Sequence, residues 1–263
     1  MDKEDITFFK KWFSEYVATH LTDDPAENET IRLKEEHTWR VCEEIVKIGQ
    51  AMNLSEHQLM LAETMALFHD IGRFQQYAVY GTFQDAVSEN HAGLGLKEMA
   101  REDILSRCPS FERAVINKVI GYHNMYSLPE DEDEYILFFA RLLRDADKLD
   151  IWQIFIDYYA GQYNQTSSTI LWGLPDNPTY CSVILKALRA KTMADTKEMT
   201  TVNDSKLLQI SWVFDVNFTP TFQTVFERKY VEKLAAALPR SEEIEELVAM
   251  VVSYVQNHIK LSG

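Results

Sequence analysis

The chain has 263 residues, of which 46% are hydrophobic and 12% aromatic, so it can bury a substantial core and does not have the composition of a disordered protein. A net charge of −15 and the absence of a run of Lys or Arg argue against a groove for DNA or RNA. No apolar run reaches the roughly 18–20 residues of a membrane span, and residues 1–5 do not resemble a secretion signal. Three widely spaced cysteines without CxxC spacing favour a reducing compartment, so we expect a cytoplasmic protein with no membrane partner.

Helical periodicity dominates the beginning of the chain. Apolar residues at helical spacing predict a helix over residues 6–21, followed by a polar loop over 22–29. A second helix is predicted over 31–52. His37 lies four residues before Val41 on the apolar stripe of this helix, and we therefore expect His37 to face the interior.

A third helix begins at Ser55, which forms a capping-box pattern with Gln58. This mostly apolar helix is predicted to carry His69 and Asp70 in its last turn. One interpretation of that pair is a plain helix end, because a histidine suits a helix C-terminus and Gly72 could be the C-cap. The other is a metal site, because burying a charged carboxylate without a partner is costly.

The next segments carry a third histidine. We predict a loop over 73–87, held by aromatic side chains, and then a helix over 88–105 whose first residue, a serine, is the N-cap. His91 falls in the first turn of this helix. Gly93 and Gly95 each cost roughly 1 kcal/mol inside a helix relative to alanine, so they indicate close approach of the backbone to a neighbouring helix or to a site.

Two further helices supply the remaining candidates. The first opens at Pro109-Ser110, and His123 continues its apolar stripe. The second, predicted over 134–159, has an apolar face that Asp147 interrupts.

The rest of the chain also reads as helical. Residues 161–179 are expected to be irregular, with a packed loop over 172–175. Four helices are predicted after them, near 181–194, 205–214, 221–238 and 241–258. Strand patterns are scarce, and no repeat or linker is visible, so we predict an all-α fold.

Six candidate ligands thus occupy helix interiors or helix ends. A single buried histidine is more often hydrogen-bonded to a carbonyl or carboxylate than bound to a metal. Several such side chains on packed helices must meet one another or stay unsatisfied in the core. One metal centre would satisfy them together, and imidazole and carboxylate suit several divalent ions. The six are His37, His69, Asp70, His91, His123 and Asp147.

The order of these residues resembles that of the HD-domain superfamily of metal-dependent phosphohydrolases. The match consists of His37, the pair His69-Asp70 and Asp147, and the segments HDIG and DADKLD resemble the two central signatures of that family. His91 and His123 resemble the additional histidines of members that hold two ions. The resemblance covers about residues 31–159.

The resemblance implies an all-α HD-domain helical bundle with a hydrolytic metal site. The chain would be a single HD-type domain over 1–263, with a metal-binding core at about 31–159 and a C-terminal helical elaboration at about 160–263. His37, His69, Asp70 and Asp147 would hold a first ion, and His91 and His123 a second, with Asp70 bridging. One or two divalent ions are expected, with Mn, Fe, Ni, Co, Mg and Zn not distinguished.

The expected activity is hydrolysis of a nucleotide or another small phosphate ester by metal-activated water. Two ions roughly 3.5–4 Å apart can activate water and neutralise phosphoryl oxygens, so no protein nucleophile is needed. Asp70, Arg73 and Lys148 are the expected catalytic residues, the last two as phosphate contacts beside metal ligands. Lys34 and Arg144, each one turn from a ligand, are weaker candidates.

Two departures from the family pattern narrow this expectation. Tyr122-His123 stands where some members have two adjacent histidines, and the Gly-Tyr-Pro motif of cyclic-dinucleotide phosphodiesterases is absent. A cyclic dinucleotide substrate is therefore not assigned. Two other functions stay open: an HD-type di-iron oxygenase with a similar six-ligand set, and a non-catalytic nucleotide sensor. The sequence leaves the oligomeric state open.

Overall fold

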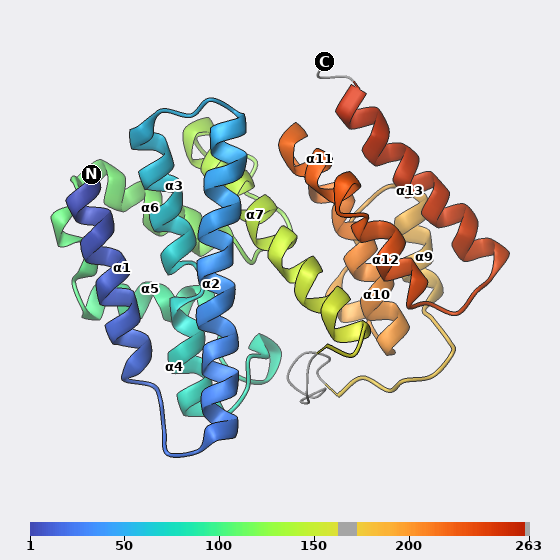
Figure 1. Ribbon diagram of the computed structural model, residues 1–263, viewed down its shortest axis with the longest axis horizontal. Helices are drawn as coiled ribbons and strands as arrows, with labels where there is room; N and C mark the ends of the chain where they lie inside the picture. Colours follow the sequence, from blue (N-terminus) through green and yellow to red (C-terminus); the bar gives the residue numbers. More distant parts are fainter. Residues whose placement is uncertain (163–172, 261–263) are drawn as a thin grey trace. The chain divides into compact units, whose positions relative to one another are not determined.

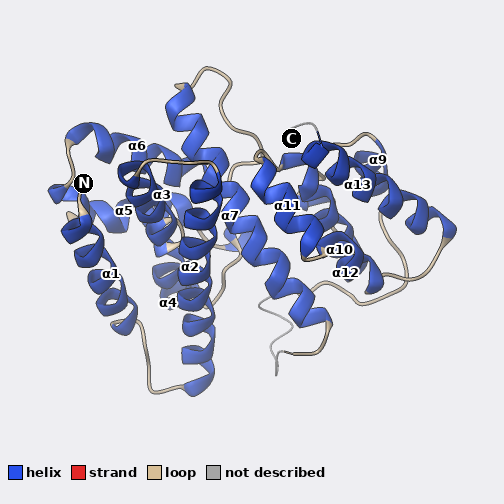
Figure 2. Cartoon of the chain, turned by 45° about the horizontal axis from the view of Figure 1, so that its top comes forward, coloured by secondary structure: helices blue, strands red, loops and turns tan. Residues whose placement is uncertain are grey.

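The computed structural model describes residues 1–162 and 173–260, which form helices joined by turns and loops and contain no strand (Figures 1 and 2). The all-α prediction is therefore confirmed. The chain divides into two compact units, residues 1–147 and 148–263. Whether they act as one domain, as the sequence suggests, stays a prediction. No helix among the described residues is long and apolar enough to cross a membrane.

The first unit contains every candidate ligand. Its helices are α1 (Lys3–Ala18), α2 (Pro25–Ala51), α3 (Glu56–Phe68), α4 (Ile71–Tyr80), α5 (His91–Arg101), α6 (Ser110–Tyr122) and the first half of α7 (Glu134–Tyr159), with short 3-10 helices η1 (Asp85–Val87) and η2 (Ile104–Arg107). The long α2 runs beside α3 and α4, and α5 packs on α4 and α6 (Figure 1).

Aromatic packing fixes the chain on either side of the His69-Asp70 pair. Phe9 of α1 makes an edge contact with Phe68, with ring centroids 5.6 Å apart, and Phe13 makes one with Phe74 at 5.8 Å. All four rings are fully buried. Burial of each contributes about 1.5–3 kcal/mol, so α1 clamps the end of α3 and the start of α4.

The second unit is built from shorter helices. They are α9 (Ser182–Arg189), η3 (Thr196–Glu198), α10 (Val202–Ser211), η4 (Trp212–Asp215), α11 (Thr219–Glu227), α12 (Tyr230–Ala236) and α13 (Glu242–Lys260). Trp152 anchors its core: the indole Nε1 donates to the Gln209 carbonyl at 2.8 Å, and the ring lies 5.8 Å from that of Tyr230.

Several predicted boundaries are confirmed by their caps. Ser55 and Gln58 form the expected capping box of α3. The Ser241 hydroxyl accepts from the Ile244 amide at 3.2 Å and so caps α13. The long helix with Asp147 has the predicted bounds. Residue 172 of the expected packed loop lies outside the described residues.

Other boundaries were wrong for identifiable reasons. The polar segment before α2 ends at Asp24, whose carboxylate caps the helix, because Pro25 suits a first helical position. Asn90, and not the predicted serine at position 88, caps α5. The helix predicted over 221–238 is split at Lys229, which has a left-handed φ of 55°.

The largest correction is α4, which occupies most of the segment predicted as a loop. Phe74, Tyr77 and Tyr80 were interpreted as anchors of a loop, although their spacing of three is also helical. Gly72 does not end a helix but lies in the first turn of α4, and the helix ends at Gly81, where φ is 64°.

Candidate metal centre

The His69-Asp70 pair lies at the junction between α3 and α4. His69 keeps helical backbone angles, whereas Asp70 has φ −104° and ψ 13°, in the sparsely populated bridge region. The chain therefore changes direction at Asp70 and starts a new helix at once. This corrects the prediction that both residues lie in the last turn of one helix.

Gly72 brings a further ligand to this junction. A Cβ atom at this glycine would overlap the His91 carbonyl oxygen and the Gly95 amide nitrogen, and would lie 2.9 Å from the Gly95 Cα atom. Only glycine permits α4 and α5 to approach so closely. The indication from Gly95 of close helix packing is confirmed, whereas Gly93 has only a side-chain oxygen nearby, at 3.7 Å.

Two groups of ligand-type atoms surround the Asp70 carboxylate. On one side, Oδ2 lies 3.5 Å from His37 Nε2 and 3.6 Å from His69 Nε2. On the other side, Oδ1 lies 3.3 Å from His91 Nε2 and 3.8 Å from His123 Nε2. Each group could hold an ion, and Asp70 belongs to both.

Asp147 completes the first of these groups. Its Oδ1 lies 3.2 Å from His37 Nε2 and 3.7 Å from His69 Nε2. The structure thus brings together all six residues that the sequence selected as ligands. His20 and His57, left out of that set, instead contact the Tyr16 carbonyl and the Glu112 carboxylate, at 3.0 and 2.9 Å.

Hydrogen bonds fix which nitrogen of three histidines points at Asp70. Nδ1 of His69 lies 2.7 Å from the Ala66 carbonyl, and Nδ1 of His123 lies 2.7 Å from the Ile120 carbonyl. A carbonyl only accepts, so each Nδ1 carries the proton and donates. The Nδ1 of His91 likewise lies 2.7 Å from Asp85 Oδ2. In the neutral rings, each Nε2 therefore presents a lone pair to the site.

The resulting cluster has the features expected of a cation site. His69 Nε2 and Asp147 Oδ1 are buried without a hydrogen-bond partner. The Nε2 atoms of His91 and His123, both acceptors, lie 3.0 Å apart. Lone pairs this close repel each other unless a proton or a cation lies between them. The donor set, imidazole nitrogen and carboxylate oxygen without thiolate, fits divalent metals.

Comparison with protein families agrees with this geometry. The HD domain family model matches residues 35–152. Residues 35–152 form an HD domain. The match includes all six ligand-type residues and both segments on which the resemblance rested. An HD domain suggests a member of the metal-dependent phosphohydrolase superfamily. The His/Asp cluster of residues 35–152 fits metal binding. Searches of curated proteins and of solved structures gave no match for the chain.

Neighbouring side chains keep the buried carboxylates of the HD domain ionised. Burial alone would raise the pKa of Asp70, but the Lys34 ammonium, 2.9 Å from Oδ2, and neighbouring histidines hold that pKa well below its usual range. Burial opposes the ionised form of Asp147 too, yet the neighbouring His37 and His69 side chains hold its pKa well below its usual range. Both carboxylates are therefore available as anionic ligands near neutral pH.

The imidazole of His91 is held neutral. Burial, followed by the nearby Arg73 charge, lowers its pKa to about 3, and the hydrogen bond to Asp85 offsets this only in part. A neutral ring is the form that binds a metal. Protonation therefore does not compete with metal binding at this histidine near neutral pH.

The predicted phosphate contacts have protein partners of their own. Arg73 Nε lies 3.5 Å from Asp70 Oδ1, and Nη1 donates to Asp85 and Gln76, each at 2.9 Å. Lys148 forms an ion pair with Asp215 at 2.6 Å within the second unit. Their roles toward phosphate stay predictions.

Lys34 and Arg144, the weaker candidates, differ in what they contact. Lys34 bonds directly to Asp70, as described above. Arg144 is buried and donates to the carbonyls of His123, Met125 and Tyr126, so it holds the backbone that follows α6. A structural role for Arg144 fits these contacts better than a substrate contact.

The sequence reasoning missed the residues that surround His91. Asp85 accepts from His91, and Gln76 and Asn124 donate to Asp85 at 2.9 and 3.2 Å. Asp85 lay in a segment interpreted as a loop with aromatic anchors. The only indication of this role in the sequence is that Asp85 is a carboxylate six residues before the candidate ligand His91.

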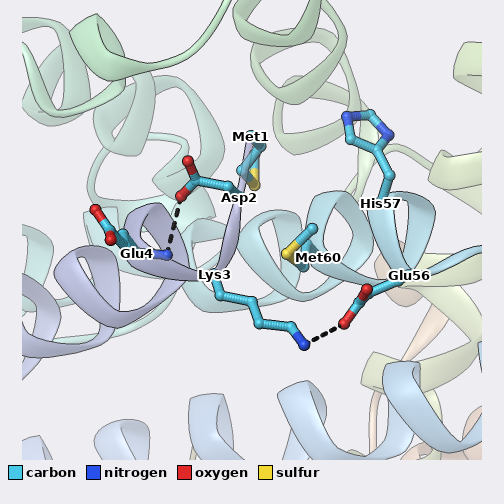
Figure 3. A pocket seen from close by; sticks show the side chains of 7 residues that line it. All are labelled: Met1, Asp2, Lys3, Glu4, Glu56, His57 and Met60. Atoms are coloured by element: carbon cyan, nitrogen blue, oxygen red, sulfur yellow. Dashed lines mark hydrogen bonds and ion pairs between the residues drawn. The ribbon is translucent and has the colours of Figure 1, made fainter.

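A separate hollow lies at the N-terminal ends of α1 and α3, lined by residues 1–4, 56, 57 and 60 (Figure 3). Lys3 and Glu56 form an exposed ion pair across it at 2.5 Å. None of the six ligand-type residues lines this hollow, which has no comparable cluster of buried groups.

Proposed function

We propose that the HD domain is a metal-dependent phosphohydrolase that acts on a nucleotide or another small phosphate ester. The observation that carries the proposal is the position of the Asp70 carboxylate. Each of its two oxygens faces a separate pair of histidine Nε2 atoms, within 3.3–3.8 Å. This arrangement supports two adjacent ions that share one carboxylate.

The proposed ligands divide as the sequence indicates. His37, His69 and Asp147 would hold one ion with Asp70, and His91 and His123 would hold the other with Asp70. Divalent ions bound there would lower the pKa of a coordinated water and offset charge on the phosphoryl oxygens. Buried side chains exclude other water from the ligands, since His37 and His69 are at most 1% exposed.

Local charge explains how an acidic chain could accept a phosphate ester. Three carboxylates, Asp70, Asp85 and Asp147, lie near two cations, Lys34 and Arg73. The cluster alone therefore repels an anion weakly. Two divalent ions would make it strongly positive, so we expect substrate binding to depend on metal loading. Arg73, beside Asp70, is the proposed additional phosphate contact.

The test is a screen of metal-free protein reloaded with Mn, Ni, Co, Fe, Mg or Zn against phosphomonoesters, phosphodiesters and nucleotides. We expect hydrolysis with at least one metal, and its loss in Asp70→Ala. Preparation with and without oxygen, with iron spectroscopy, covers the oxygenase alternative. A mixed-valence di-iron signal without hydrolysis under any metal would refute the proposal. Nucleotide binding without hydrolysis would favour a sensor.

A further inference from the structure

Asp85 is the hub of a hydrogen-bond network just outside the proposed ligands. Its Oδ2 accepts from His91 Nδ1 at 2.7 Å and from Asn124 Nδ2 at 3.2 Å. Its Oδ1 accepts from Arg73 Nη1 and from Gln76 Nε2, both at 2.9 Å. A carboxylate offers about four acceptor directions, and here four donors use them. The orientation of Asp85 is therefore fixed from both sides.

The loop around Asp85 is also tied to the same network. The two N–H groups of Gln76, which is fully buried, are shared among three acceptors: Asp85 Oδ1, Ser88 Oγ at 2.9 Å and the Glu89 carbonyl at 2.8 Å from Nε2. Arg73 donates to the Phe83 carbonyl. The loop between α4 and α5 is thus held at several points by two side chains of α4. Asp85 meets His91 because of this anchoring.

The Asp85 carboxylate determines which nitrogen of His91 carries the proton. An ionised carboxylate only accepts, so it favours a proton on His91 Nδ1. The lone pair on Nε2 then faces Asp70 Oδ1 at 3.3 Å and His123 Nε2 at 3.0 Å. With the opposite tautomer, an N–H bond would point into the position proposed for the second ion and would block it.

We propose that Asp85 is a positioning residue that commits His91 to the Nδ1-protonated form and thereby makes the second ion position competent to bind metal. This inference rests on the metal centre in the proposed function but not on the reaction. Outer-shell partners of metal-binding histidines typically change metal affinity by about 10–100-fold. Asp85 does not contact the His37–His69–Asp147 group in the geometry described, so we expect its effect to be confined to the second ion.

Asp85→Asn separates the tautomer effect from a loss of packing. Arg73 Nη1 and Gln76 Nε2 can only donate, so the amide oxygen must stay on their side. The amide NH₂ then faces His91 Nδ1, which must accept, and the proton moves to Nε2. We expect nitrogen-15 NMR of the metal-free protein to show protonation at Nδ1 of His91 in the wild type and at Nε2 in this variant.

Metal content gives an independent readout. Equilibrium dialysis with Mn²⁺ and elemental analysis should give two ions per wild-type chain and one per Asp85→Asn chain, with the second ion bound at least tenfold more weakly. Asp85→Ala removes the acceptor without supplying a donor. The affinity of Asp85→Ala for the second ion should fall less than that of Asp85→Asn. A merely structural role of Asp85 would not produce this order.

Glu89→Gln is the matched control, because it makes the same carboxylate-to-amide change on the same loop. Glu89 pairs with the exposed Lys97. We expect this variant to keep two ions and the wild-type tautomer. The inference is overturned if wild-type protein binds one ion, if Asp85→Asn binds two, or if its His91 keeps the Nδ1 proton. Should Asp85→Asn not fold, two tightly bound ions in Asp85→Ala would overturn it equally. Absence of hydrolysis would refute the proposed function without changing these readouts.

Discussion

Replacement of Gly72 by alanine tests whether contact between α4 and α5 assembles the metal centre. The added Cβ would lie 2.9 Å from Gly95 Cα, whereas ordinary contacts of a Cβ begin at 3.4 Å. The helices must therefore separate by at least about 0.5 Å, and by more to relieve the overlaps with the His91 carbonyl and the Gly95 amide. All three atoms are backbone atoms, so no side chain can rotate away.

The energetic cost follows from these contacts. Overpacking of this kind costs about 3 kcal/mol, at the upper end of the usual range, and alanine in a helix returns up to about 1 kcal/mol relative to glycine. We expect a net loss of about 2 kcal/mol in the unfolding free energy. For a chain of this length, that lowers the melting temperature by about 4–8 °C.

The same separation of helices should affect metal binding. The clashing carbonyl belongs to His91, so the ligand moves with the helix, and ligand distances tolerate only about 0.2 Å. Urea unfolding of metal-free Gly72→Ala and its Mn²⁺ content are the two assays. Gly93→Ala, on α5 with His91, would make only an ordinary 3.7 Å contact with the Asn90 side chain and should retain both properties. Wild-type stability and metal content in Gly72→Ala would refute the argument.

Two further predictions concern individual ligands. Asp70→Ala should lose both ions, because Asp70 belongs to both groups, whereas His20→Ala should retain them. Elemental analysis measures the metal content of both variants. Undiminished metal in Asp70→Ala, or loss of metal in His20→Ala, would contradict the assignment. For metal-free protein, the folded-state pKa of His91, about 3, lies below its ordinary value of 6.5, so the unfolded chain binds more protons between these values. The unfolding free energy should therefore fall from pH 6.5 toward pH 3, and urea unfolding at pH 7 and pH 5 should show a smaller fall in His91→Gln than in the wild type.

Much of the site could be predicted because its residues interrupt simple patterns. His37 and Asp147 each occupy the apolar stripe of a long helix, where a polar residue is conspicuous. Helical periodicity therefore placed both correctly without any tertiary information. The pairing of His69 with Asp70 was found from its position at the end of an apolar segment.

The parts that could not be predicted depend on packing between helices. Gly72 has the local pattern of a helix end, whereas the close approach of His91 and Gly95 shows why the first turn of α4 requires a glycine at this position. Asp85 gains its role from the position of His91 in the folded chain. The Lys148–Asp215 ion pair joins residues far apart in sequence, and nothing in the local pattern indicates it.

The proposed ligands come from α2, α5, α7, the C-cap of α6 and the junction of α3 with α4. An ion held by them would act as a cross-link between distant segments of the chain. At a free concentration 100 times its dissociation constant, one ion adds about 2.7 kcal/mol of stability. Resistance to proteolysis would then rise and fall with metal supply, so the cellular lifetime of this protein would depend on the concentration of available metal.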